Sequence, residues 1–248
     1  MLNRVNPARR RAESGAGNRG DSAAEMLNDG LTVTDWIATG DVWLFREINT
    51  HGVNPVFDWL MPLIGAAGVM KWLLLALMVV LLWRGGFNGR VLVLLASLCV
   101  AIGDPLIINP VKHAVARPRP YQALTEVRRV SWQPSGAVAL MVSNRQGKAN
   151  SMPSAHVANN VTLVLAWLLV YGWRRWWWLL GWPLLMMCSR VYTGDHFPAD
   201  TVAGLLLGAA YTLLICCLAD KIWQNYGRRL APKLYDKHPT LLASRRAR

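Results

Sequence analysis

The sequence predicts an all-α polytopic membrane protein, a bundle of about six transmembrane helices. Of its 248 residues, 53% are hydrophobic, including 13 Trp, and yet the formal net charge is +13. A soluble domain of this size rarely combines such apolarity with such charge. Apolar runs separated by short basic loops instead indicate helices that cross a membrane.

Five apolar segments supply most of the expected helices. They cover approximately residues 70–83, 91–111, 155–171, 176–189 and 198–219. Several are shorter than the ~20 residues that span a bilayer, so flanking aromatic residues are expected to extend them. A sixth, weaker element combines an amphipathic stretch, residues 33–48, with an apolar piece, residues 55–69. The sequence leaves open whether this element spans the membrane or lies in the interface.

Basic residues in the connections predict the orientation. Arg84 and Arg90 flank one short loop, Arg174 and Arg175 occupy another, and the chain after Ala219 carries eight basic and two acidic residues. If the segments alternate, these three regions share one side, which the positive-inside rule places in the cytoplasm. We therefore expect an inner-membrane protein with a cytoplasmic C-terminus. Connections 112–153 and 190–197 then lie at the periplasmic or outer face.

The chain ends are expected to be tails around a membrane domain of residues 31–219. Residues 1–30 are polar and lack the apolar core of a signal peptide, so a disordered basic tail is predicted. Its arginine cluster, residues 9–11, suits topology or anionic lipid better than nucleic acid. Residues 220–248 form the predicted basic cytoplasmic tail. The four cysteines lie in apolar runs without metal-ligand spacing, which indicates buried packing residues.

Two of the five histidines begin predicted membrane helices at the expected outer surface. His156 follows Ser154, a plausible N-cap, and the free N–H groups of such a helix end attract anions. His196 comes just before Pro198, which suits a first helical turn, and Asp200 lies four residues after His196. If that turn is helical, His196 and Asp200 share a face. A carboxylate at one imidazole nitrogen fixes the tautomer and leaves the other nitrogen as a nucleophile.

Three cations belong to the same two outer connections. Lys112, Arg119 and Arg190 could hold a phosphoryl group and stabilise the charge of its transition state. Taken singly, each is better interpreted as an interfacial anchor that reaches the lipid headgroups. Taken together with the two histidines, they favour a phosphate site. Because no carboxylate cluster suited to a metal accompanies them, we expect neither a metal nor another cofactor.

Three motifs resemble those of the type 2 phosphatidic acid phosphatase superfamily, which also includes vanadium haloperoxidases. They are KHAVARPRP at residues 112–120, PSAH at 153–156 and SRVYTGDHFPAD at 189–200. All three are complete, in order and placed relative to the predicted helices as in that family, and the resemblance covers about residues 55–219. The second motif commonly has Gly where this chain has Ala155. Because the backbone N–H remains, we expect activity to survive this difference.

The resemblance implies a metal-independent lipid phosphatase that works through a phosphohistidine. His196 would attack phosphorus, and Asp200 would orient the imidazole ring of His196. His156 would protonate the leaving oxygen and then activate water. The implied phosphate-binding groups are Lys112, Arg119, Ser154, Arg190 and the backbone N–H of Ala155. The motif spacing favours Arg119 over Arg117, which is expected to face lipid headgroups.

The substrate stays open at this level. The expected partners are a lipid phosphate and membrane lipids, with no nucleic acid, and the oligomeric state is undetermined. The resemblance favours undecaprenyl diphosphate, with phosphatidylglycerol phosphate, phosphatidic acid and lipid A as alternatives. Lipid phosphotransfer is a second possibility, and a non-catalytic lipid-binding or transport protein is the weakest. The segment between Pro120 and Ser151 is expected to shape the choice, with Trp132, Arg145 and Lys148 as headgroup contacts.

Two carboxylates are left without an assigned role. Asp104 lies inside an apolar segment, where an ionisable residue is a functional hypothesis by default. A structural pair with a nearby cation is an equally good interpretation. Asp195, beside His196, is interpreted either as a solvated loop residue or as a substrate contact.

Overall fold

The structure is a computed structural model that describes residues 33–133, 135–143 and 145–243. The chain divides into two units, residues 1–40 and 41–248. The first unit, where it is described, is the beginning of helix α2 (Val33–Arg46). The predicted tail of residues 1–30, with its arginine cluster, lies outside the described residues. The second unit contains all three motifs.

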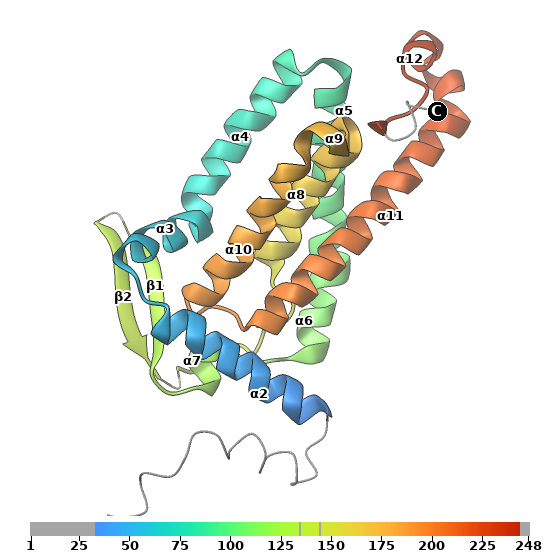
Figure 1. Cartoon of the computed structure of the whole chain (residues 1–248). Helices are drawn as coiled ribbons and strands as arrows, with labels where there is room; N and C mark the ends of the chain where they lie inside the picture. The colour runs from blue at the N-terminus through green and yellow to red at the C-terminus, as the bar shows by residue number, and fades with distance from the viewer. Residues whose placement is uncertain (1–32, 134, 144, 244–248) are drawn as a thin grey trace, which may run out of the picture. The chain divides into compact units, whose positions relative to one another are not determined.

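Helices account for most of the second unit, which confirms the mostly helical prediction (Figure 1). The longer helices are α3 (Pro55–Gly65), α4 (Ala67–Arg84), α5 (Gly86–Gly103), α8 (Ala155–Tyr171), α10 (Gly181–Tyr192) and α11 (Pro198–Leu230). Shorter helical pieces are η2 (Glu47–His51), η3 (Asp104–Ile108), α6 (Asn109–Val115), α7 (Pro120–Ala123), α9 (Trp173–Trp176), η4 (Trp177–Leu180) and α12 (Pro232–Lys237). Helix α8 packs against α5, α10 and α11, and it therefore lies at the centre of the bundle.

Small residues allow the close packing of α11 on α8. A Cβ atom at Gly208 would lie 2.5 Å from Cγ1 of Val161, and one at Gly204 would collide with the carbonyl oxygen of Ser154. Gly204 and Gly208 therefore serve close helix packing, as their sequence positions suggest. The backbone N–H of Ser154 donates to the carbonyl of Asp200 at 2.9 Å. This contact joins the start of α8 to the start of α11.

Two helical stretches among the described residues are long and apolar enough to cross a membrane. They are Gly86–Ala123 and Pro198–Leu230, and α8 is a shorter apolar helix. Together with exposed Leu, Val and Trp side chains along α4 and α11, they indicate a membrane protein. Length and composition do not establish the predicted count of six spans.

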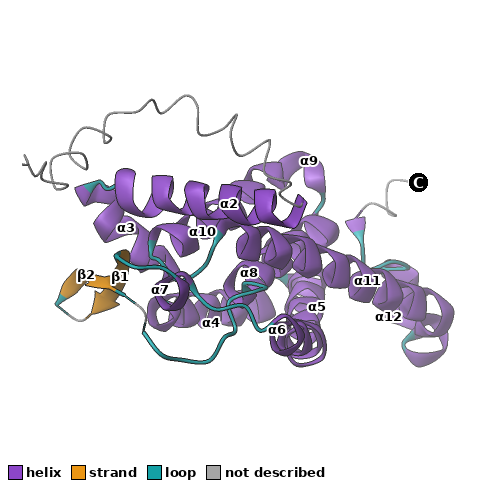
Figure 2. Cartoon of the chain, turned by 90° about the horizontal axis from the view of Figure 1, so that it is seen from below, coloured by secondary structure: helices purple, strands orange, loops and turns teal. Residues whose placement is uncertain are grey.

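A two-stranded hairpin corrects the all-α prediction. Strands β1 (Val127–Gln133) and β2 (Gly136–Val142) pair antiparallel, with Val127 opposite Val142 and Gln133 opposite Gly136. The hairpin packs against α3 beside the bundle (Figure 2), where Trp132 meets Trp59 edge to face with ring centroids 5.5 Å apart. Valine, tryptophan and a glycine at positive φ are ordinary strand and turn residues. The sequence predicts only an outer connection, residues 112–153, for this part of the chain.

Parts of the chain after Ala219 pack against the bundle. Helix α11 continues to Leu230, and the ring of His238 stacks on Phe87 with centroids 4.0 Å apart. Leu241 and Leu242 are buried. The predicted burial of the cysteines holds for Cys99 and Cys216 and is wrong for Cys188 and Cys217, which are exposed on helices α10 and α11.

Candidate active site

The three motifs meet at one end of the helices. The starts of α8 and α11 and the end of α6 lie together there, while α9 and the α4–α5 turn lie at the opposite end (Figure 1). Gly194, at φ +76°, lets the α10–α11 loop reverse. The backbone N–H groups of Asp195 and His196 then both donate to the carbonyl of Arg190 at 3.2 Å. This turn brings His196 back over the first turn of α11.

His196 is held by two oxygen atoms on its Nδ1 side. Nδ1 lies 3.6 Å from Oδ2 of Asp200 and 3.4 Å from Oγ of Ser151. The Ser151 hydroxyl donates to Oδ2 of Asp200 at 2.5 Å, so its oxygen is left to accept a hydrogen bond from the N–H at Nδ1 of His196. Both partners favour the tautomer with hydrogen on Nδ1, which leaves the Nε2 lone pair free. Ser151 was not singled out from the sequence, although it starts the run that contains the second motif.

Burial sets the protonation of His196, which is 1% exposed. Burial lowers the pKa of His196 below its ordinary value, while the neighbouring carboxylate of Asp200 raises it. The charges of Arg190 and Arg119 add to the lowering. The imidazole is therefore neutral at neutral pH, which is the state that a nucleophile requires.

Arg117 corrects one expectation, because it does not face lipid headgroups. It donates to Oδ1 of Asp200 at 2.8 Å and to Oδ2 of Asp41 at 2.5 Å, and its guanidinium lies 4.3 Å from the ring centre of Phe197. The other oxygen of Asp41 accepts from the backbone N–H of Ala199 at 2.7 Å. Two buried carboxylates thus draw Arg117 inward. Nothing local in the sequence marks Asp41 as their second member.

The three predicted cations, Lys112, Arg119 and Arg190, all contact other residues of the site. Arg190 is buried, pairs with Asp195 and donates to the carbonyl of Gly65 at 3.4 Å. Lys112 and Arg119 are tied to the same residue: Nζ of Lys112 donates to the carbonyl of Asn150 at 3.3 Å, and Nε of Arg119 to its side-chain oxygen at 3.2 Å. The structure therefore brings both ends of the first motif to the segment that precedes Ser151.

Unpaired polar atoms mark where an anion fits. Among the described residues, the buried atoms without a hydrogen-bond partner include Oγ of Ser154 and Nε of Arg190. Ser154 occupies the N-cap of α8 as predicted, but its side chain makes no capping hydrogen bond. The first N–H groups of a helix, here from Ala155 and His156, have no intrahelical partners. A phosphoryl group at this helix end would satisfy such donors.

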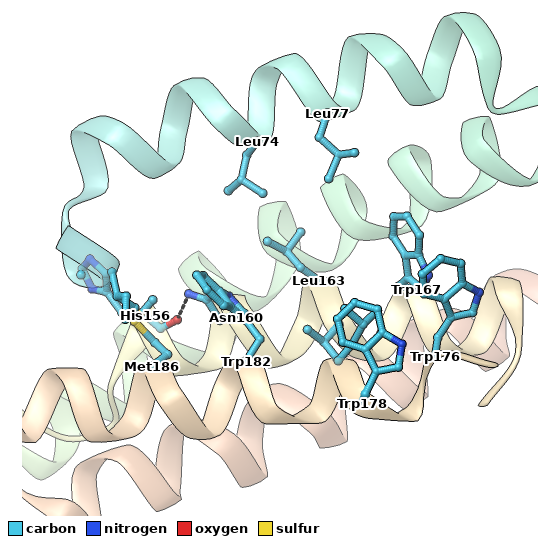
Figure 3. A pocket seen from close by; sticks show the side chains of 14 residues that line it. Leu74, Leu77, His156, Asn160, Leu163, Trp167, Trp176, Trp178, Trp182 and Met186 are labelled. Carbon is cyan, nitrogen blue, oxygen red and sulfur yellow. Dashed lines mark hydrogen bonds between the residues drawn. The ribbon is translucent and has the colours of Figure 1, made fainter. Parts of the chain in front are cut away.

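Two cavities adjoin the motifs and share His156 and Gly65. A polar cavity of about 460 Å³ is lined chiefly by Arg119, Arg129, Ser131, Trp132, Thr193, Arg190 and Asp195. An apolar cavity of about 410 Å³ runs between α4, α8 and α10. In Figure 3, Leu74 and Leu77 of α4 face Leu163 across it, and Trp167, Trp176 and Trp178 lie at its far end. The site therefore combines a polar cavity, lined by arginines, with an elongated apolar cavity, the apolar cleft.

The residues expected to contact the headgroup lie in different places. Trp132 lines the polar cavity, whereas Arg145 lines a separate hollow beside Gln122, and Lys148 is exposed. Asp104 accepts from the side-chain amide of Asn159 at 2.9 Å, so its hydrogen-bond partner is an amide and not the cation that the structural interpretation expected.

Asp195 is buried and not a solvated loop residue. It pairs with Arg190 and, at 3.5 Å, with Arg129. Burial alone would raise the pKa of Asp195, but the neighbouring cations outweigh it, so the carboxyl stays ionised. Arg129, like Ser151 and Asp41, was not predicted as part of the site.

Comparison with known proteins gives the family. The model of the PAP2 superfamily matches residues 90–224. Undecaprenyl-diphosphatase YbjG of Escherichia coli is 36% identical over 88 residues, which cover 34% of this chain and 41% of that protein. The chain thus aligns with less than half of that relative. Lipid A 4'-phosphatase of Bacteroides thetaiotaomicron is 23% identical over 174 residues, 68% of this chain and 72% of that protein.

Two solved structures share the fold. LpxE of Aquifex aeolicus superposes with a TM-score of 0.54 at 21% identity, covering 70% of this chain and 93% of that one. The transmembrane PAP2-type phosphatidylglycerolphosphate phosphatase of Bacillus subtilis gives 0.52 at 19% identity, covering 75% and 87%. The family match spans more than half of the sequence and includes all three motifs, and on that basis the chain belongs to the PAP2 superfamily.

Proposed function

We propose that this protein is an integral-membrane lipid phosphatase that hydrolyses a phosphomonoester or diphosphate through a phosphohistidine intermediate. The observation that carries the proposal is the junction at His156 between the arginine-lined cavity and the apolar cleft. A lipid phosphate has the same two parts, a charged head and an apolar chain. Its head would occupy the cavity and its chain the cleft.

In the first step, Nε2 of His196 bonds to phosphorus while the bond from phosphorus to the lipid oxygen breaks. Burial and the charge of Arg190 lower the pKa of His156 to about 4 in the free protein, so His156 must take up its proton together with the anionic substrate. It then donates that proton to the lipid oxygen, and the lipid leaves as a neutral alcohol or a lipid monophosphate. In the second step, His156 removes a proton from water, whose oxygen attacks the phosphohistidine. Inorganic phosphate leaves, and His196 returns to its neutral state.

The cations stabilise the charge on the phosphoryl oxygens in both steps. Arg119, Lys112 and Arg190 would bind these oxygens together with Ser154 and the backbone N–H of Ala155. Asp200, held by Arg117 and Ser151, keeps the His196 ring in position and balances the charge that develops on it. No step in this scheme requires a metal ion, so the proposed activity is metal-independent.

Undecaprenyl diphosphate is the leading candidate substrate, in line with the name of the Escherichia coli relative. The names of the other relatives support lipid A and phosphatidylglycerol phosphate as alternatives, and phosphatidic acid is a further one. Transfer of the phosphoryl group to a second lipid would use the same intermediate. The basic loops support a site at the periplasmic face of the inner membrane and a cytoplasmic C-terminus.

The test is phosphate release by the purified protein in detergent, with EDTA present, across a panel of lipid phosphates and diphosphates. We expect release from at least one lipid and loss of that release in His196→Ala. His51→Ala, an exposed histidine far from the motifs in sequence, is the matched control and should retain activity. Lipid consumption without inorganic phosphate would favour phosphotransfer. Normal turnover in folded His196→Ala would refute the nucleophile, and a requirement for added magnesium would refute metal independence.

A further inference from the structure

Strand β1 is hydrogen-bonded to the start of the α10–α11 loop, which carries His196. The backbone N–H of Val130 donates to the carbonyl of Thr193 at 3.2 Å. The side-chain amide of Asn49 donates to the carbonyls of Arg128 and Tyr192 at 2.7 and 2.9 Å, and its oxygen accepts from the N–H of Arg128 at 3.0 Å. These hydrogen bonds therefore hold strand β1 against the end of α10 and the residue that follows it, Thr193.

Arg129 reaches the polar cavity from this strand. Its guanidinium lies 4.6 Å from the ring centre of Tyr121, and Nη2 lies 3.5 Å from Oδ1 of Asp195. The side chain is 34% exposed, against 10% for Arg190, which makes the shorter pair with Asp195. Arg129 can therefore turn to a bound anion without leaving a buried carboxylate unpaired.

Positively charged groups outnumber carboxylates in the lining of the polar cavity. Among the described residues, the lining contains three guanidinium groups, of Arg119, Arg129 and Arg190, and one carboxylate, of Asp195. Arg119 and Arg190 belong to the motifs that hold the transferred phosphoryl group, and Lys112 lies close by. Arg129 belongs to none of the motifs. An additional, half-exposed and positioned guanidinium suits a second anionic group on the same substrate.

We infer that Arg129 is a specificity-determining residue that binds a second phosphoryl group, bonded to the one that is transferred. The protein would then select lipid diphosphates over lipid monophosphates. Ser131, which lines the same cavity two residues along the strand, is placed to donate a further hydrogen bond to that group. The inference rests on the proposed function and deepens it, since the second phosphoryl group is part of the leaving group.

The experiment compares kcat/KM for a prenyl diphosphate and the matching prenyl monophosphate, with one chain length and one detergent. The wild type should prefer the diphosphate. Arg129→Gln should lower the ratio of the two kcat/KM values by about tenfold or more, because a charge-assisted hydrogen bond is lost for one substrate only. Arg129→Lys keeps the positive charge, so its ratio of kcat/KM values should lie between those of the wild type and Arg129→Gln.

The matched control is Arg128→Gln. Arg128 lies next to Arg129 on the same strand, but its guanidinium pairs with Asp58 at 2.5 Å, and it does not line the polar cavity. In Arg128→Gln, the ratio of kcat/KM for the diphosphate to kcat/KM for the monophosphate should stay at the wild-type value. Equal loss of both activities in Arg129→Gln would show a merely structural role and overturn the inference, as would an unchanged ratio or a wild type that prefers the monophosphate.

A second measurement does not depend on turnover. Inorganic diphosphate and orthophosphate are titrated into wild type and Arg129→Gln by calorimetry. The substitution should weaken diphosphate binding by about tenfold or more and affect orthophosphate less. Equal weakening of both ions would overturn the inference. A protein that releases phosphate from no lipid, yet shows the selective loss of diphosphate binding, would refute the proposed reaction and leave the second-phosphate site standing.

Discussion

The hydroxyl of Ser151 bridges the proposed nucleophile and its carboxylate. It donates to Asp200 and faces Nδ1 of His196, so one side chain fixes both partners. We expect Ser151→Ala to lower kcat by about tenfold to hundredfold, the equivalent of a hydrogen bond to a charged group, with little change in KM. Ser151→Thr keeps the hydroxyl and should recover part of the rate. Equal kcat in Ser151→Ala and wild type would contradict this role.

The protonation of His196 predicts the acid limb of the pH profile. A nucleophilic imidazole must be neutral, and burial lowers the pKa of His196. Activity should therefore persist as pH falls through about 6.5, the ordinary histidine value, and decline only below it. The measurement is kcat/KM against pH.

Arg119→Gln checks the cause of that shift. Arg119 lowers the pKa of His196, so its removal should move the acid limb to higher pH, in addition to reducing the rate. The wild type and Arg119→Gln are measured with the same substrate, whose own titration is identical in the two profiles. A difference between the two acid limbs therefore reports a change in a group of the protein. An acid limb above about 6.5 in the wild type would contradict the buried, neutral nucleophile.

Single residues also show where sequence reasoning stops. The shared face expected of His196 and Asp200 depended on their spacing of four residues, and the structure brings those two side chains together. Arg117 and Arg119 are two residues apart in one motif, and spacing alone could not show that Asp41 would draw Arg117 inward. Contacts between residues 76 positions apart have no local signal.

At the scale of elements, the C-terminal end of helix α3 contacts Arg190. Its last residue, Gly65, accepts a hydrogen bond from Arg190, and a Cβ atom there would lie 2.6 Å from Nη1 of that arginine. Gly65→Ala should displace the guanidinium and lower kcat/KM by about tenfold to hundredfold through misplacement of a phosphate ligand. Weaker inhibition by vanadate, a mimic of pentacoordinate phosphorus, should accompany the loss.

Gly181→Ala is the matched control for this substitution. Gly181 begins α10, and a Cβ atom there would meet nothing within 4 Å. Activity and vanadate inhibition should both stay at the wild-type level. If Gly65→Ala behaves in the same way, α3 does not constrain Arg190.

The elements differ in how far the sequence predicts them. Apolar runs predict helices well, because a helix in a membrane satisfies all of its own backbone hydrogen bonds. The place of the hairpin beside the site was missed because it depends on partners far along the chain, Asn49 and Thr193. That miss also hid Arg129, since only the strand brings it to the cavity.

At the scale of the molecule, the two ends of the helices differ in chemistry. The motifs gather at one end, while the α4–α5 turn, α9 and α12 lie at the other (Figure 1). Arg84 and Arg90 flank that turn, and Arg174 and Arg175 belong to α9. The basic connections and the site thus lie at opposite ends, as alternating segments require. This arrangement is the one that the positive-inside rule predicts for a site outside the cytoplasm.

The orientation itself can be tested with single cysteines. Arg145, in the connection that carries the first motif, and Arg175, in α9, are both exposed, so Arg145→Cys and Arg175→Cys place a thiol at each end. In intact cells, a membrane-impermeant thiol reagent should label the first and reach the second only after permeabilisation. The unmodified chain serves as the blank, because it reports any labelling of its own cysteines, of which Cys188 and Cys217 are exposed. Labelling of Arg175→Cys alone in intact cells would place the phosphate site in the cytoplasm, and its substrate would then be a lipid of the inner leaflet.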